Sequence, residues 1–412
     1  MPTHRTPRRS FSSGAGRLAL GLSLVLWLQS ADSLAAPPGA PAPQPLPARD
    51  FIQEGRILYR VVACSGDSAL PAGIGEDVVQ AHCAQMKPMM DFYRHSYLPK
   101  VRKFLGGWIP AGSPEIVVYP FGGGDLLSAL TAYPNASEVT TLSLEHVADP
   151  TRFATLKPEE MKVSLQLLRK RVIGLLKFSD SKTDSLQELQ RGGLSGQLAF
   201  FLIGLAVHGF EPVSIRYFQF APDGKLVYLS RADIESLSAQ QAKKLRFSAT
   251  APDFSAAFSN AEITFRPLDP AQGKETRVHR HIAADLSNAH LPAPLLLHLG
   301  QKARIAAMTK AASYLLWRNE FSFIRDYLLK NMDLMVSDST GIPPEFARKA
   351  GFVQETAGQF SGSFLGASAK HNQDFRDLWT QHPGRSIDFR FGYLDKSLRG
   401  HLLLTKRESK GP

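Results

Sequence analysis

The sequence lacks the residue spacings that mark the common catalytic and nucleotide-binding motifs. It contains no Gly-x-Ser-x-Gly elbow, no His-Glu-x-x-His helix and no P-loop. Because Ser/His/Asp triads assemble from positions far apart in a chain, such a triad stays open. Basic residues are scattered, and no motif combines them with aromatic residues, so the formal net charge of +11 does not predict a nucleic-acid partner.

Cysteine is almost absent, since Cys64 and Cys83 are the only two in 412 residues. No Cys-x-x-Cys or His-x-x-Cys spacing surrounds them, which disfavours a metal pair or a reactive thiol without excluding either. In an oxidising compartment, two cysteines at this separation most simply form one disulfide. We therefore predict a disulfide between Cys64 and Cys83.

Long apolar runs are few: Leu198–Val207, whose ten residues predict a buried helix, and Leu18–Leu28 near the amino end, which follows a segment with four arginines. That run is too short to cross a bilayer, because a spanning helix takes roughly 20 apolar residues. Ser33-Leu34-Ala35 then provides small residues at the two positions that a signal peptidase reads. We predict a secretory signal peptide at residues 1–35 and a proline-rich linker at residues 36–50.

The signal peptide predicts a bacterial protein that is periplasmic or secreted. Arg8-Arg9-Ser10-Phe11 resembles the twin-arginine export signal, although an ordinary basic segment can contain the same pair, so the Sec route stays open. No cysteine follows the apolar run, and no lipid anchor is expected. We expect no transmembrane span after removal of the signal, and an envelope surface is a candidate partner.

A strand–turn–helix–strand pattern lies in the stretch from Ser113 to Pro150. Its first strand is a continuous β-branched run, as in strands that are buried on both faces. Pro120 cannot donate to a strand ladder and closes that strand, while Pro134 ends the helix. The predicted elements are a strand at Glu115–Tyr119, a helix at Leu126–Tyr133 and a strand at Val139–Leu144.

Three glycines and two acids of this stretch are the candidate ligand-binding residues: Gly122, Gly123, Gly124, Asp125 and Glu145. Glycines permit positive φ and close approach of a ligand, and Asp125 stands at the helix N-cap. Ligands of open α/β sheets bind at the carboxyl ends of strands, where an acid about 20 residues past the glycines often takes a ribose hydroxyl. The alternative is a tight turn without a ligand, because Leu127 occupies the place of the third glycine in a GxGxxG motif.

The rest of the chain predicts an N-terminal helical region at residues 51–112, which carries the disulfide, and an α/β domain at residues 113–412. Within the first region, alternating apolar residues predict a strand at Phe51–Ala63. One or two long helices are expected at Lys302–Lys330. Three hairpins are predicted: Val213–Phe220 with Leu226–Leu229, Glu262–Arg266 with Thr276–Ala283, and a closing pair of Ile387–Tyr393 with Leu402–Thr405.

Two histidines, His279 and His281, share one face of the strand predicted at Thr276–Ala283, and Asp285 is close behind. Metal sites use the His-x-His spacing. Simple alternation along a strand produces the same spacing, so the two histidines are weak candidates and we predict no metal.

A set of motifs resembles a family of exported bacterial proteins with no assigned function. The resemblance covers most of the mature chain and implies export but no activity. Its motifs are Tyr119-Pro120-Phe121-x-Gly123-x-Asp125, Leu144-Glu145, Ala312-Ser313-Tyr314 to Asp326-Tyr327, Ser337-Asp338-x-x-Gly341-Ile342-Pro343 and Phe391-Gly392-Tyr393. At the level of fold, the glycine-rich first turn, the acid after the second strand and the terminal hairpin are similar to the class I methyltransferase-like sheet.

These observations predict an α/β protein with a Rossmann-like, methyltransferase-like mixed sheet, flanking helices and a C-terminal β-hairpin. The first functional hypothesis is an exported protein that binds or scaffolds at the cell envelope without a dedicated cofactor, because charged cofactors do not cross a bilayer freely. The second is an enzyme, methyltransferase-like or degenerate, with its site at the crevice of Gly122–Asp125 and Glu145. Whether the protein is an enzyme stays open.

Overall fold

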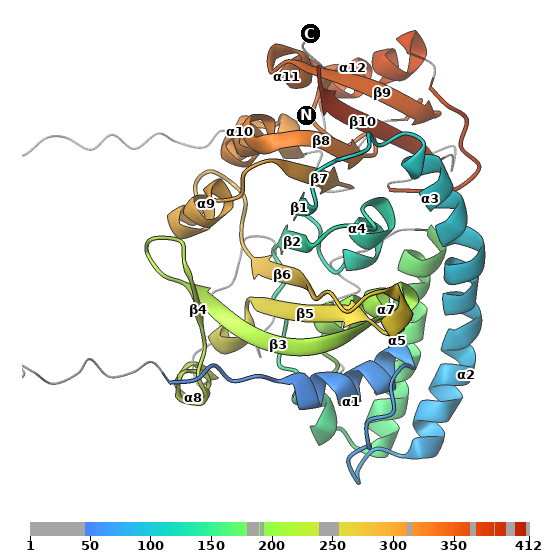
Figure 1. Ribbon diagram of the computed structural model, residues 1–412, viewed down its shortest axis with the longest axis vertical. Coiled ribbons are helices and arrows are strands. Elements are labelled where there is room, and N and C mark those ends of the chain that lie inside the picture. The colour runs from blue at the N-terminus through green and yellow to red at the C-terminus, as the bar shows by residue number, and fades with distance from the viewer. Residues whose placement is uncertain are drawn as a thin grey trace, which may run out of the picture. The chain divides into compact units, whose positions relative to one another are not determined.

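The computed structural model describes residues 46–178, 189, 193–238, 255–310, 315–362, 368–382, 384–392 and 400–408. The predicted signal peptide and most of the predicted linker lie outside these residues. Residues Pro47–Pro412 form one compact unit with a ten-stranded mixed sheet and helices on both of its faces (Figure 1). The α/β class predicted from the sequence is therefore confirmed.

The strands follow one another across the sheet in the order β4-β3-β5-β6-β2-β1-β7-β8-β10-β9. Neighbours from β6 to β8 pair in parallel, whereas β10 pairs antiparallel with both β8 and β9. The strands are β1 Ile116–Pro120, β2 Glu138–Ser143, β3 Phe210–Phe220, β4 Leu226–Tyr228, β5 Ala261–Pro267, β6 Arg277–Ala283, β7 Ile305–Thr309, β8 Met332–Ser337, β9 Phe352–Gly358 and β10 His401–Arg407.

The central strand β1 is buried on both faces, as its continuous apolar run predicts. Val118 is paired with Thr140 of β2 on one side and with Ala307 of β7 on the other. Its side chain belongs to one apolar cluster, and the side chain of Val117 belongs to the cluster on the opposite face. Because parallel neighbours need crossover connections, helices must cover both faces.

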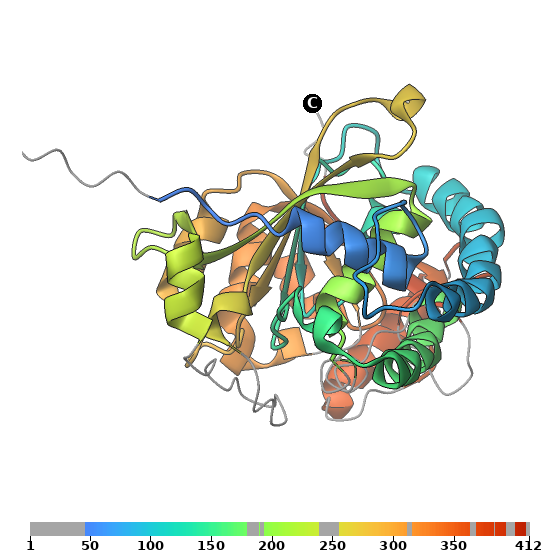
Figure 2. The same ribbon diagram turned by 90° about the horizontal axis from the view of Figure 1, so that it is seen from below.

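Two groups of helices cover the sheet, and Figure 2 shows the blue-to-green group and the orange group on opposite sides. The face of Val117 packs against α1 Ile52–Ala63, α2 Glu76–Phe92, α3 Leu98–Gly106, α4 Leu126–Ala132, α5 Pro158–Phe178 and α7 Gly196–Val207. The face of Val118 packs against α9 Ala293–Gly300, α10 Ser322–Asn331 and α11 Pro344–Lys349. Near the edge strands β4 and β9 lie α8 Arg231–Ser238 and α12 Ala369–Gln381 (Figure 1).

The first two predicted hairpins are confirmed. β3 and β4 pair antiparallel, with Phe218 opposite Tyr228. β5 and β6 also pair antiparallel, with Ile263 opposite His279. β3 further pairs with β5, so these strands extend the parallel part of the sheet at one side.

The amino-terminal part of the unit is helical, and the strand predicted at Phe51–Ala63 is wrong. These residues form α1, which buries Leu58, Val61 and Val62 and packs on α7. Spacings of three and four residues place these side chains on one helical face. The alternation of apolar residues that suggested a strand is coincidental, because burial against α7 selects the helix.

The predicted disulfide is confirmed between Cys64, which follows α1, and Cys83 in α2, whose Cα atoms lie 5.4 Å apart. Cys64 has a left-handed φ of 54° and ends α1 at this bend. The disulfide therefore ties the end of α1 to the middle of α2.

Of two expectations for the carboxyl half, one is wrong and one is confirmed only in part. The closing hairpin does not form, because β10 inserts between β8 and β9 and Leu403 pairs with both Ser337 and Thr356. Residues 387–392 form no strand, and Tyr393 lies outside the described residues. The helices predicted over Lys302–Lys330 form only in part. The range begins with β7, a buried strand whose alanines resemble helix-packing residues in the sequence, and ends in the helix α10.

The helix α7 is buried on every side, as its uninterrupted apolar sequence predicts. Within the part of the chain that the structure describes, no helix is both long and apolar enough to cross a membrane.

Candidate functional site

The glycine bend Gly122–Gly124 lies at the carboxyl end of β1, where the order of the strands reverses between β2 and β7. The backbone N–H of Gly122 donates to the carbonyl oxygen of Leu142, 3.0 Å away at the end of β2. A Cβ at Gly122 would lie 2.9 Å from the ring and from the carbonyl oxygen of Tyr119. Glycine is thus required for the bend to pack against its own strand.

The side chain of Asp125, which is 1% exposed, is held by three neighbours. As the N-cap of α4, it accepts from the backbone N–H of Ser128 at 3.0 Å. It also accepts from the hydroxyl of Tyr119 at 3.0 Å and from the amine of Lys310 at 2.6 Å. The carboxylate therefore joins the glycine bend, β1 and the end of β7.

The amine of Lys310 lies in the same buried cluster, with the side chain 5% exposed. It donates to the hydroxyl of Ser128 at 2.8 Å and lies 5.2 Å from the ring centroid of Phe391. Burial, together with the negative charge of Asp125, raises the pKa of Tyr119 well above its ordinary value. We call Tyr119, Asp125, Ser128 and Lys310 the switch-point cluster.

A second buried acid, Asp338, follows β8 at the same edge of the sheet. It accepts from the backbone N–H of Thr340 at 2.8 Å and from the Thr340 hydroxyl. Gly392, with a φ of 78°, packs on it so closely that a Cβ there would lie 2.5 Å from a carboxylate oxygen. Residues 391–392 therefore cover both Asp338 and the switch-point cluster.

Glu145 lies two residues beyond β2, next to the strand that carries the glycine bend, and it is 7% exposed. Its backbone carbonyl accepts from Nε2 of His281 at 2.8 Å. The glycine bend and Glu145 thus follow the carboxyl ends of adjacent parallel strands. Their role in ligand binding stays a prediction.

His279 and His281 are fully buried and are bridged by Thr141. Because the carbonyl of Glu145 can only accept, Nε2 of His281 carries its proton and Nδ1 accepts from the Thr141 hydroxyl at 2.9 Å. The same hydroxyl then accepts from Nε2 of His279 at 3.0 Å. Burial lowers the pKa of His281 to about 4 and that of His279 well below its ordinary value, so both rings are neutral.

These contacts give the two histidines a packing role against the ring of Phe201, which lies 4.3 Å from His279 between centroids. Among the described residues, no group of three or more His, Cys, Asp or Glu side chains could hold a metal ion. Asp285 instead lies 3.6 Å from His290 and accepts from the backbone N–H of Ser287.

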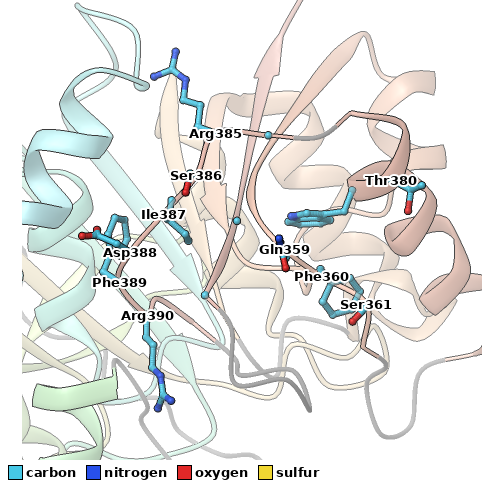
Figure 3. Close-up of a pocket in the computed structure, with 14 residues that line it drawn as sticks. Gln359, Phe360, Ser361, Thr380, Arg385, Ser386, Ile387, Asp388, Phe389 and Arg390 are labelled. Carbon is cyan, nitrogen blue, oxygen red and sulfur yellow. The ribbon is translucent and has the colours of Figure 1, made fainter.

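A cavity of about 870 Å³ lies at the carboxyl end of β9, and we call it the β9 cavity. One wall is the segment 384–390, and the opposite wall comes from the end of β9 and from α12 (Figure 3). Its lining residues are Gly358, Gln359, Phe360, Ser361, Trp379, Thr380, Gly384, Arg385, Ser386, Ile387, Asp388, Phe389, Arg390 and Gly400.

The segment 384–390 is fixed on both sides. The carbonyl oxygen of Arg385 accepts from the N–H of Gly358 at 2.8 Å, which joins the segment to β9. On the other side, a guanidinium N–H of Arg385 donates to the carbonyl oxygen of Gly107 at 2.7 Å, and Asp388 pairs with Lys100 at 2.9 Å. The wall therefore bridges β9 and the region of α3.

No protein-family model, curated protein or solved structure matches this chain.

The sequence did not single out Lys310, and it gave no chemical role to Tyr119 or Asp338. Tyr119 and Asp338 were visible only as parts of motifs. Lys310 directly follows the buried run of β7, and a strand reading of that run would have placed it at the carboxyl edge. The β9 cavity had no signal in the sequence, because the end of β9 and the segment 384–390 are more than 20 residues apart in the chain and come together only in the fold.

Proposed function

We propose that this protein is exported and binds a small ligand at the cell envelope, without a dedicated cofactor, in the β9 cavity. The proposal rests on the difference between the switch point, which is filled by buried side chains, and the β9 cavity, which is open, at the same edge of the sheet. At the switch point, where α/β proteins commonly bind nucleotides, Asp125 and Lys310 are buried against each other. The β9 cavity has instead a volume within the usual range of small-molecule sites, about 300–1,000 Å³.

Export is supported by the sequence features of residues 1–35 and by the disulfide of Cys64 and Cys83. Disulfides persist in oxidising compartments outside the cytoplasm. Cell fractionation followed by intact-mass measurement tests this part, because an exported protein should be recovered outside the cytoplasm without residues 1–35. Recovery of the full-length chain in the cytoplasm would contradict it.

The binding proposal is tested by thermal shift of the mature protein against a library of small envelope components. A ligand at 100 times its dissociation constant should raise the unfolding free energy by about 2.7 kcal/mol. Thr380→Trp, which adds an indole to the cavity lining, should abolish the shift. Gln85→Trp adds the same side chain to an exposed position on α2 and should preserve it. A shift that survives Thr380→Trp would place the ligand elsewhere.

A second candidate function is an enzyme with a methyltransferase-like site at Gly122–Asp125 and Glu145. The strand order supports it. When the seven strands β6-β2-β1-β7-β8-β10-β9 are renumbered by their order in the chain, they read 3-2-1-4-5-7-6 across the sheet, and only β10, the last of them in the chain, is antiparallel to its neighbours. That arrangement is the one expected of a class I methyltransferase-like sheet. The glycine bend and the buried Glu145 follow the first and second of these strands.

This candidate is tested with a thermal-shift panel of nucleotides, sulfonium cofactors and divalent metals. A response that Glu145→Ala removes and Thr380→Trp leaves intact would favour the enzyme. The absence of any response across the panel would count against it. The two variants separate this site from the β9 cavity, because neither residue contributes to both places.

A further inference from the structure

We propose that the β9 cavity takes a neutral, hydroxyl-rich ligand, a saccharide. This inference builds on the proposed binding function and names the class of ligand. Three properties of the lining carry it: the direction of the charged side chains, the kind of uncharged polar groups, and the aromatic floor.

The charged side chains of the segment 384–390 point away from the space between the walls. Figure 3 shows the guanidinium groups of Arg385 and Arg390 extending to opposite ends of the segment, and Asp388 on its far side. Arg385 donates to the carbonyl oxygen of Gly107, and Asp388 pairs with Lys100. An anionic or cationic ligand in the cavity would therefore lack a dedicated counter-charge from these residues.

Uncharged hydrogen-bonding side chains line the cavity from both walls: Gln359, Ser361, Thr380 and Ser386. Hydroxyl and carboxamide groups both donate and accept hydrogen bonds. Sugar hydroxyls have the same dual character, so this lining can match several of them at once.

Two aromatic side chains form the floor. The ring centroids of Phe360 and Trp379 lie 5.6 Å apart, and each residue is 5% exposed. The indole N–H of Trp379 donates to the carbonyl oxygen of Ala357 at 3.3 Å, which fixes the ring beside β9. The small part of each ring that reaches the cavity adds an apolar surface that the C–H groups of a pyranose ring can contact.

Backbone packing keeps the two walls at their separation. A Cβ at Gly384 would lie 1.7 Å from the carbonyl oxygen of Thr356, and one at Gly400 would lie 2.2 Å from the carbonyl oxygen of Phe389. Glycine at both positions lets the segment 384–390 lie directly against its neighbours. The cavity is thus a preformed space rather than one that a ligand must open.

Isothermal titration calorimetry of the mature, oxidised protein tests the ligand class. The probes are maltotriose and N-acetylchitotriose as neutral trisaccharides, trigalacturonic acid as an anionic trisaccharide of the same length, and a neutral tripeptide. We expect a neutral trisaccharide to bind, with Thr380→Trp and Ser386→Trp each weakening it by roughly tenfold or more. Gln85→Trp should leave the affinity unchanged, and melting curves should show that all three variants are folded.

The outcomes separate the ligand class from the binding function. Binding of only trigalacturonic acid or only the tripeptide, lost in Thr380→Trp, would overturn the proposal of a neutral saccharide and retain the cavity as a binding site. Neutral-saccharide binding that survives both cavity variants would overturn the cavity. No heat from either neutral trisaccharide at millimolar concentration would overturn the saccharide proposal.

A polymeric glycan on beads identifies the source of a sugar that binds. Retention that free trisaccharide competes away indicates a segment of an envelope polymer, and binding of the trisaccharide without retention indicates a free sugar. Both results agree with the ligand class.

Discussion

At the scale of single residues, the buried pair of Lys310 and Asp125 is the contact on which the carboxyl edge of the sheet depends. Both side chains are withdrawn from water, and their charges are compensated within the cluster. A buried charge without its partner is costly, whereas replacing both partners by uncharged groups is often tolerated. Replacing one member of the pair should therefore lower the stability more than replacing both members together.

Lys310→Met should lower the free energy of unfolding by about 3–5 kcal/mol, because Asp125 would stay buried without its counter-charge. Urea denaturation measures this loss, and the double variant Lys310→Met/Asp125→Asn should recover part of it. Lys349→Met is the control, since it removes one partner of Glu345 from an exposed pair and should change the stability far less. Equal effects of the two lysine variants would contradict the role given to Lys310.

Thr141 gives a second prediction at this scale, because its hydroxyl bridges His279 and His281. Thr141→Val should destabilise the protein by about 1–3 kcal/mol, since buried ring nitrogens lose their partner. Thr141→Ser keeps the hydroxyl and should cost less, although it loses a methyl group. A larger loss for serine than for valine would show that packing, and not the hydrogen bonds, decides stability here.

At the scale of elements, the disulfide joins α1 to α2 across a separation of 19 residues. In the chain-entropy model, a closed loop of this size stabilises the fold by roughly 3 kcal/mol. Reduction should therefore lower the melting temperature of the wild-type protein, while a Cys64→Ala/Cys83→Ala variant should melt lower and show no response to reductant. A variant that melts as high as the oxidised wild type would contradict the prediction.

The sequence predicted correctly those elements that are determined by turn residues and apolar runs at neighbouring positions. The strand–turn–helix–strand unit around Gly122 and the two hairpins formed nearly as expected, because turn residues and apolar runs are read from neighbouring positions. The segment Phe51–Ala63 was misread because its apolar residues fit both periods. Only its contact with α7, more than 130 residues away in sequence, selects the helix.

The candidate site also has parts that the sequence predicted and parts that it did not. The sequence placed Gly122 and Glu145 at one edge of the sheet, which follows from two adjacent strands. It could not place Lys310 against Asp125, because that contact depends on β7 lying beside β1. The insertion of β10 between β8 and β9 could not be predicted either, because these strands are far apart in the chain and no short turn connects β10 to either of them.

At the scale of the whole molecule, several buried histidines make stability depend on pH. Burial lowers the pKa of His208 to about 3 and that of His82, His281, His298 and His371 to about 4, from an ordinary value of 6.5. In the unfolded chain these rings take up protons below pH 6.5, while in the folded protein they stay neutral. Stability is therefore complete above pH 6.5 and falls as the pH drops toward 4.

Urea midpoints should change little between pH 7.5 and pH 6.5 and should decrease from there down to pH 5. Glu138 and Glu262 do not add to this decrease above about pH 4.5. Against the cost of burial, their basic and hydrogen-bonding partners lower their pKa values from 4.5, so their stabilising contribution is present above that pH and is lost below it. A midpoint that does not change between pH 7 and pH 5 would show that the folded protein takes up as many protons as the unfolded chain.

One short stretch, residues 384–392, contacts both the β9 cavity and the buried groups at the ends of β7 and β8. Its first part forms a wall of the β9 cavity, and Phe391 and Gly392 lie over Lys310 and Asp338. A guest molecule that binds against the wall restrains the same stretch that lies over the buried amine of Lys310. If binding of the guest changes the equilibrium of the Lys310–Asp125 contact by some factor, then breaking that contact must change the affinity for the guest by the same factor. Occupancy of the cavity would then be detectable at Lys310, which the guest does not touch.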